Sequence, residues 1–137
     1  MINTSDLSMI IAQINWVWFA FSVVAAFAVG AIWYSLLFFN TWRVVFKVDM
    51  PDQNTPYGWI RSFIIQLITG SMYGLVCFTI AYLSVGFAFF TVFTIAGWQM
   101  CTNTFKYGGW KHFLQSVMIE SGYTVVSGSI YILFSLF

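Results

Sequence analysis

Charged residues are scarce in this chain. Asp, Glu, Lys and Arg make up 7% of its 137 residues, whereas roughly a quarter of a soluble domain is charged. Hydrophobic residues make up 61% and aromatic residues 22%. A soluble protein of this length could not bury so much apolar surface. The composition therefore excludes a soluble domain and predicts a protein whose partner is the lipid bilayer.

Residues that bind metals or perform catalysis are also few. The chain has two cysteines and one histidine. Cys77 and Cys101 fall at different expected depths, which argues against a disulfide, and His112 stands beside Lys111, where we expect a solvated imidazole. The sequence contains no metal-ligand spacing, no nucleotide-binding glycine loop and no nucleophile motif. We therefore expect no metal, no cofactor, no nucleic-acid partner and no enzymatic activity.

Four apolar stretches follow one another along the chain. They cover residues 16–39, 62–83, 86–105 and 113–137. Each is long enough to cross a hydrocarbon core of ~30 Å, which takes about 20 helical residues. The sequence thus predicts an all-α membrane protein, with residues 1–137 forming a single four-helix transmembrane bundle. We expect residues 1–15 to form a short N-terminal tail or an interfacial helix.

The basic residues predict the orientation of this bundle. They flank the loop after the first stretch and the loop after the third, which are Arg43, Lys47 and Arg61, then Lys106 and Lys111. With four crossings these two loops lie on the same side. The positive-inside rule places that side in the cytoplasm. Both termini are then expected outside.

Glu120 is the one charged residue inside the fourth stretch. A carboxylate at the bilayer centre costs about 3 kcal/mol on insertion scales, so it is a candidate functional group. It lies about 12 Å below the interface, counted from His112 at about 1.5 Å per residue. Counting to the same depth predicts a polar layer that holds Glu120 with Gln99, with Thr69 or Gln66, and with the hydroxyl of Tyr34 or Tyr73. Tyr123 and Ser127 share the polar face of the fourth stretch with Glu120. Because no cation is expected at that depth, we expect a neutral, hydrogen-bonded carboxyl.

Small residues predict where helices pack closely. Gly70 and Gly74 form a G-x-x-x-G motif, which fits either a notch within the bundle or a contact between subunits. Gly30 with Trp33 predicts a second close contact. The third stretch has one face that is expected to point to the interior, formed by Thr91, Thr94, Trp98, Cys101 and Thr102, with Gln99 at its edge.

One segment carries a resemblance to a known family. It reads Val29-Gly30-Ala31-Ile32-Trp33-Tyr34-Ser35-Leu36-Leu37-Phe38-Phe39 and is followed by Trp42. Together with Trp110, Phe113, Leu114 and Gly122-Tyr123, it resembles an uncharacterised bacterial membrane family called domain of unknown function 1761, itself a four-helix unit. The resemblance spans residues 15–137 and implies a bacterial inner-membrane location. Leu36 replaces the family's usual proline and Asn40 its common glycine, so we expect a straighter end to the first helix.

Glu120 itself has three interpretations: a structural hydrogen-bonding group, a binding or conduction group in a pocket, and a contact to another subunit. The function expected from the small loops and missing catalytic motifs is a structural or accessory component. Such a component forms a homo-oligomer or joins a membrane-protein partner. The alternative is a small oligomeric channel or transporter with Glu120 in a polar pathway.

Overall fold

The computed structural model describes residues 4–45, 56–106 and 109–137, and every element within these ranges is helical. Two of the elements, η1 and η3, are single π-helical turns inside longer helices. In chain order the elements are α1 (Thr4–Gln13), α2 (Trp16–Ile32), η1 (Trp33–Leu37), α3 (Phe39–Val45), α4 (Pro56–Leu83), α5 (Val85–Lys106), α6 (Trp110–Ser116), η3 (Val117–Ser121) and α7 (Gly122–Phe134).

Within the described ranges, four helical segments are long and apolar enough to cross a membrane. They are Trp16–Leu37, Ile60–Leu83, Val85–Lys106 and Trp110–Phe134. The expected all-α class and the four spans are confirmed. The largest shifts in a boundary are at the fourth span, which runs from Trp110 to Phe134 rather than from Phe113 to Phe137.

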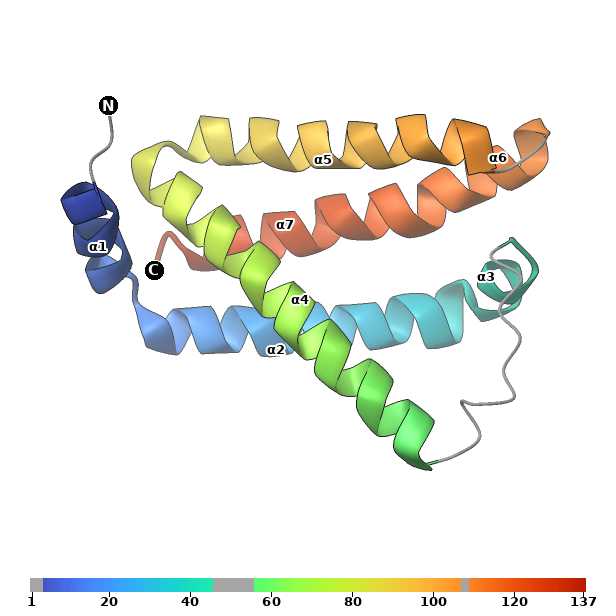
Figure 1. Ribbon diagram of the computed structural model, residues 1–137, viewed down its shortest axis with the longest axis horizontal. Coiled ribbons are helices and arrows are strands. Elements are labelled where there is room, and N and C mark those ends of the chain that lie inside the picture. The colour runs from blue at the N-terminus through green and yellow to red at the C-terminus, as the bar shows by residue number, and fades with distance from the viewer. Residues whose placement is uncertain (1–3, 46–55, 107–108) are drawn as a thin grey trace.

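Helix α7 forms the centre of the bundle. Figure 1 shows α5, α7 and α2 running alongside one another in that order, while α4 crosses them obliquely, and α7 contacts all three of these helices. A helix surrounded by other helices in a membrane needs side chains that are small or whose polar groups are hydrogen-bonded within the bundle. Its buried residues are Thr124, Ser127, Gly128, Tyr131 and Ile132.

Two of the expected packing glycines receive tyrosines of α7. A Cβ atom on Gly30 would lie 2.6 Å from the Tyr123 hydroxyl oxygen. A Cβ atom on Gly74 would overlap the ring of Tyr131, and one on Gly70 would lie 3.5 Å from the hydroxyl of the same tyrosine. The G-x-x-x-G motif of α4 therefore holds an aromatic side chain of the same chain.

The N-terminal part of the described chain contains the short helix α1. Asn15 ends this segment and begins α2, where its side-chain oxygen accepts a hydrogen bond from the Trp18 N–H at 3.4 Å. Helix α1 and the C-terminal end of α7 lie at one end of the bundle, and α3 and α6 lie at the other (Figure 1).

The first span does not end straight, so the expectation drawn from Leu36 is wrong. The Phe38 N–H donates to the Trp33 carbonyl at 3.0 Å, the five-residue spacing of a π turn. Such a turn bends a helix without proline. The chain then enters α3, which contacts both η1 and α6.

Candidate functional site

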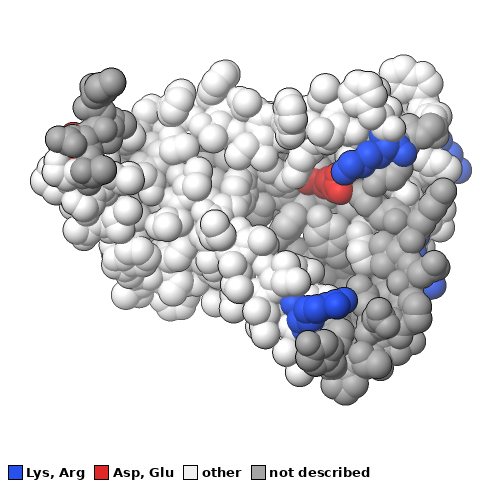
Figure 2. All heavy atoms as spheres, in the orientation of Figure 1, with Lys and Arg blue, Asp and Glu red and all other residues white. Residues whose placement is uncertain are grey.

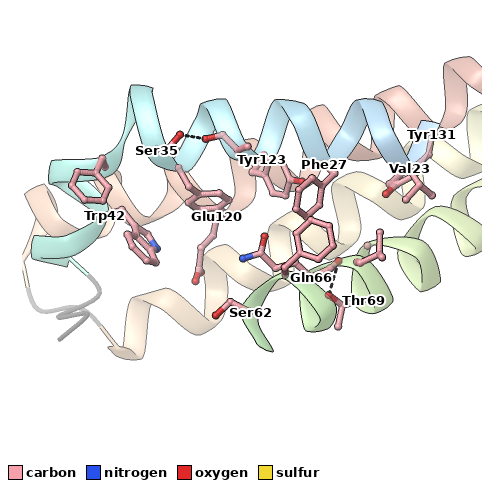
Figure 3. Close-up of a pocket in the computed structure, with 17 residues that line it drawn as sticks. Val23, Phe27, Ser35, Trp42, Ser62, Gln66, Thr69, Glu120, Tyr123 and Tyr131 are labelled. Atoms are coloured by element: carbon pink, nitrogen blue, oxygen red, sulfur yellow. Dashed lines mark hydrogen bonds between the residues drawn. The ribbon is translucent and has the colours of Figure 1, made fainter. Parts of the chain in front are cut away.

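A cavity of about 700 Å³ opens between α2, α4 and the fourth span, toward the end that carries α3 and α6 (Figure 3). We call it the Glu120 cavity, because Glu120 is the charged residue in its described lining. The other lining residues are Val23, Phe27, Gly30, Ala31, Tyr34, Ser35, Phe39, Trp42, Ser62, Phe63, Gln66, Leu67, Thr69, Gly70, Tyr123 and Tyr131. Most of this surface is apolar, and the polar side chains of Ser62 and Gln66 lie near Glu120.

The carboxylate of Glu120 has a neutral partner from another helix. The amide nitrogen Nδ2 of Asn103, on α5, donates to Glu120 Oε2 at 2.8 Å. Asn103 is completely buried, and its Oδ1 atom has no hydrogen-bond partner among the described residues. A buried amide is a natural donor to a carboxyl group in a membrane, where the alternative is an unsatisfied polar group.

Gln99, the partner expected on the third span, lies one turn away from this contact. Its Oε1 atom accepts from the Thr124 hydroxyl at 2.8 Å. Helical side chains lean toward the N-terminus of their own helix. In two antiparallel helices, Glu120 therefore leans toward the α6 end while Gln99 leans away from it. Asn103 lies nearer the α6 end, and its side chain leans toward Glu120.

Glu120 lies within a π turn of the fourth span. The turn η3 includes Glu120 and is packed against η1, because the indole Nε1–H of Trp33 donates to the Ile119 carbonyl at 3.0 Å. The ring of Trp33 also lies close to Gly122, where an added Cβ would be 3.1 Å from it. Two π turns from distant parts of the sequence thus meet beside the cavity, and such turns are frequent at functional sites.

The structure brings part of the expected polar layer together. Gln66, Thr69, Tyr34 and Tyr123 all line the cavity with Glu120, as do the packing residues Gly30 and Gly70. In Figure 3 the carboxyl of Glu120 lies between Trp42, Gln66 and Ser62.

Two of these polar side chains are already satisfied elsewhere. The hydroxyl of Thr69 donates to the Ile65 carbonyl of its own helix at 2.8 Å. The hydroxyl of Tyr123 donates to the Ala26 carbonyl at 3.0 Å, which ties α7 to α2. These two side chains therefore shape the cavity wall and do not donate hydrogen bonds to Glu120.

Other expected residues lie outside the lining, in hydrogen bonds between helices or within one helix. The Tyr73 hydroxyl donates to the Thr124 carbonyl at 3.1 Å, between α4 and α7. The Ser127 hydroxyl donates to the Tyr123 carbonyl at 2.7 Å within α7. Gln99, Trp33 and Gly74 also lie outside the lining, in the contacts described above.

The inward face expected for the third span is wrong. Trp98 is 70% exposed, whereas the buried residues of α5 are Ala88, Val92, Ala96 and Asn103. The threonines need no interior partners, because Thr91 and Thr94 donate to carbonyls of their own helix, at 2.9 and 2.8 Å. Small residues four apart would have indicated the packed face, and Asn103 continues that line.

Sequence reasoning missed several residues of the site. The cavity lining includes Ser35 of η1 and Phe39 and Trp42 of α3, because α3 follows η1 and contacts the fourth span at α6. Ser62, which begins the expected second stretch, was not assigned to the polar layer. Asn103 was missed because it lies close to Lys106 at the end of its span, where a polar residue usually faces water.

Charges near the cavity are distributed unevenly. Figure 2 shows an acidic group in a hollow, with basic side chains on either side of it at the same end of the molecule. The described basic residues are Arg43, Arg61, Lys106 and Lys111, all exposed. In the described ranges no three His, Cys, Asp or Glu residues are grouped to hold a metal. The site is thus an apolar cavity whose wall carries the Glu120 carboxyl, which the buried Asn103 amide contacts, at the end of the molecule where the described basic residues gather.

Comparison with protein families, curated sequences and solved structures gave no match. The site is therefore interpreted from its own geometry. That geometry combines a sizeable, mostly apolar cavity with a few polar groups in its wall, which is the usual form of a site for a small molecule.

Proposed function

We propose that this chain is a non-enzymatic accessory component of a membrane, acting by binding an amphipathic molecule in the Glu120 cavity. The observation that carries the proposal is the cavity itself. Its volume of about 700 Å³ falls within the roughly 300–1,000 Å³ typical of small-molecule sites. Its apolar wall suits a hydrocarbon chain, and its single carboxyl suits a polar head.

The shape of the bundle supports entry from the bilayer. Helix α4 diverges from the other spans toward its N-terminal end (Figure 1). Phe63, Gln66 and Leu67 of this part line the cavity and are also exposed. An opening between α4 and its neighbours would let an amphiphile enter sideways, with its chain parallel to the lipid chains.

Orientation and location form part of the proposal. We place the two basic loops in the cytoplasm, both termini outside, and the chain in a bacterial inner membrane. The gathering of basic side chains at one end of the molecule supports this orientation (Figure 2). We also propose that the chain belongs to the family called domain of unknown function 1761, which its sequence resembles. We further propose that it assembles with itself or with another membrane protein.

Native mass spectrometry of the protein released from mild detergent tests the binding function. Ala31 lines the cavity and is exposed, so Ala31→Phe fills the cavity without removing a buried contact. Ala28→Phe, on an exposed part of α2 outside the lining, is the matched control. We expect a bound amphiphile in the wild type and in Ala28→Phe, and its loss in Ala31→Phe. Equal occupancy in all three proteins, or an empty wild type, would overturn the proposal.

The alternative is an oligomeric channel or transporter with Glu120 in its pathway. The partial exposure of Glu120 in the cavity favours it, because a purely structural carboxyl could be sealed completely. Four helices rarely enclose a pathway alone, so this function requires assembly. Ion or proton flux in liposomes that Glu120→Gln abolishes, with assembly intact, would support transport. Equal flux above protein-free liposomes in both proteins would exclude Glu120 from the pathway.

A further inference from the structure

We propose that the Glu120 cavity selects amphiphiles whose head group is an ammonium. This inference rests on the proposed binding function and names the class of ligand. It is carried by three features of the cavity: a carboxyl group that has no cationic partner among the described residues, an aromatic wall beside that group, and an apolar region beyond it.

The carboxyl of Glu120 is available to a cation. Its described hydrogen bond engages Oε2 and comes from the neutral amide of Asn103, which leaves Oε1 for a ligand. Ser62 and Gln66 lie next to the carboxyl in Figure 3 and can accept or donate further hydrogen bonds. A bound ammonium head would supply the counter-charge that the described residues do not place beside this carboxyl, and that charge would favour the ionised form over the neutral form expected from the sequence.

Aromatic rings form the wall next to this group. Tyr34, Trp42 and Tyr123 all line the cavity. The ring centroids of Tyr34 and Trp42 are 6.1 Å apart with planes at 66°, and those of Tyr34 and Tyr123 are 5.3 Å apart at 67°. Because the ring planes are inclined to one another, both faces and edges of these rings can border the Glu120 cavity. Their faces attract ammonium groups through the ring quadrupole, which is the basis of aromatic cages.

The rest of the cavity suits a single chain. It extends along α2 from Tyr34 to Val23, a distance of about 16 Å at about 1.5 Å per residue. Phe27 and Phe63 form part of the wall of this region and contact each other edge to face, with ring centroids 4.8 Å apart. An anionic head would meet the Glu120 carboxylate, and a neutral head would gain neither the ion pair nor the cation–π contacts. Charge and shape together favour an alkylammonium.

Photolabelling in lipid nanodiscs tests both the cavity and the head group. The probes share one alkyl chain with a terminal diazirine and differ in the head: trimethylammonium, hydroxyl or sulfate. Mass spectrometry of the labelled peptides locates the chain, and competition by unlabelled probe gives relative affinity. We expect labelling at the cavity wall, with the ammonium probe favoured at least tenfold over the hydroxyl probe. Tenfold corresponds to about 1.4 kcal/mol.

Variants assign this preference to the residues. Glu120→Gln should reduce the preference for ammonium by at least about tenfold while the hydroxyl probe still labels the cavity. Trp42→Leu keeps the carboxyl and should weaken ammonium labelling by roughly threefold, since a cation–π contact contributes about 0.5–1 kcal/mol. It tests the inference independently of the folding of Glu120→Gln. Trp98→Leu, at an exposed position outside the lining, is the control.

The outcomes separate the two proposals. Equal labelling by ammonium and hydroxyl probes at the cavity would overturn the ammonium inference and leave the binding function standing. Absence of cavity labelling by every probe would overturn the binding function itself. An aminophospholipid probe identifies the source of the head group: stronger labelling than by the alkylammonium assigns the site to bilayer lipid, and weaker labelling assigns it to a free amine. Both of these results support the ammonium class.

Discussion

The two ends of the bundle are packed differently. At the end near α1, the side chains of Phe78, Val92 and Ile132 form a closed core and are 3%, 0% and 0% exposed. At the end near α6, Phe63 and Ile64 of α4 are 51% and 48% exposed, and the Glu120 cavity lies between the helices. We call these the closed end and the open end.

The difference follows from how each end satisfies its polar groups. The core of the closed end includes the small residues Ala81 and Ala88, and the Thr79 hydroxyl there donates to a carbonyl of its own helix. The helices can therefore approach closely. The open end contains both π turns, the Asn103–Glu120 pair and the diverging part of α4. Stability and binding are therefore expected to respond to different substitutions.

The largest loss of stability is expected for Gly74→Leu, in the notch that holds Tyr131. A side chain there would overlap a buried ring, so we expect the free energy of unfolding to fall by about 3 kcal/mol. Gly97→Leu is the matched control, because a Cβ at Gly97 would meet nothing within 4 Å. Thermal unfolding followed by size-exclusion chromatography compares the two. Similar midpoints for both variants would contradict the close packing described for the notch.

Asn103→Ala is the largest expected perturbation at the open end. It removes the described donor to Glu120 and empties a completely buried position, so we expect a loss of about 1–3 kcal/mol. The neighbouring Thr104→Ala changes an exposed residue whose hydroxyl donates to its own helix, and should stay within about 0.5 kcal/mol. The same unfolding measurement applies. If Asn103→Ala unfolds no earlier than the control, the amide does not stabilise the carboxyl.

Trp33→Phe should have a smaller and more local effect. It removes the hydrogen bond to the Ile119 carbonyl, which contributes about 1 kcal/mol. Hydrogen–deuterium exchange should become faster in Val117–Ser121 and remain unchanged in the second half of α7. Trp110→Phe, at a residue that is 77% exposed, should leave both regions unchanged. Uniform protection in Trp33→Phe would mean that the two π turns are not coupled.

The spans were predictable because their signal is the length of uncharged sequence, which depends on no tertiary contact. Glu120 was found for the same reason, as a charge where the bilayer disfavours one. The packing glycines were also identifiable, since Gly30 and Gly74 mark where an aromatic side chain needs room. The structure adds which aromatic side chain enters each notch.

The partner of Glu120 could not be found by counting residues from the span ends. Counting compares backbone depth, whereas the contact depends on the lean of both side chains and on helix boundaries that were uncertain by several residues. The π turns were equally hidden, because no residue type specifies them as proline specifies a kink. Trp42 entered the site only through the bend that follows η1.

Glu120→Gln is expected to change stability least, and this small effect is informative. The glutamine side-chain oxygen can still accept from Asn103 Nδ2, so we expect the unfolding free energy to stay within about 0.5 kcal/mol of wild type. Glu120→Leu, by contrast, leaves a buried amide unpaired and should cost about 1–3 kcal/mol.

A stable Glu120→Gln protein that loses a bound ammonium ligand would separate the charge of this residue from its hydrogen bond. The hydrogen bond then belongs to the fold and the charge to the ligand. If Glu120→Gln instead unfolds as readily as Glu120→Leu, the ionised carboxylate itself holds the open end together. The contrast between a closed structural end and an open binding end would then no longer hold.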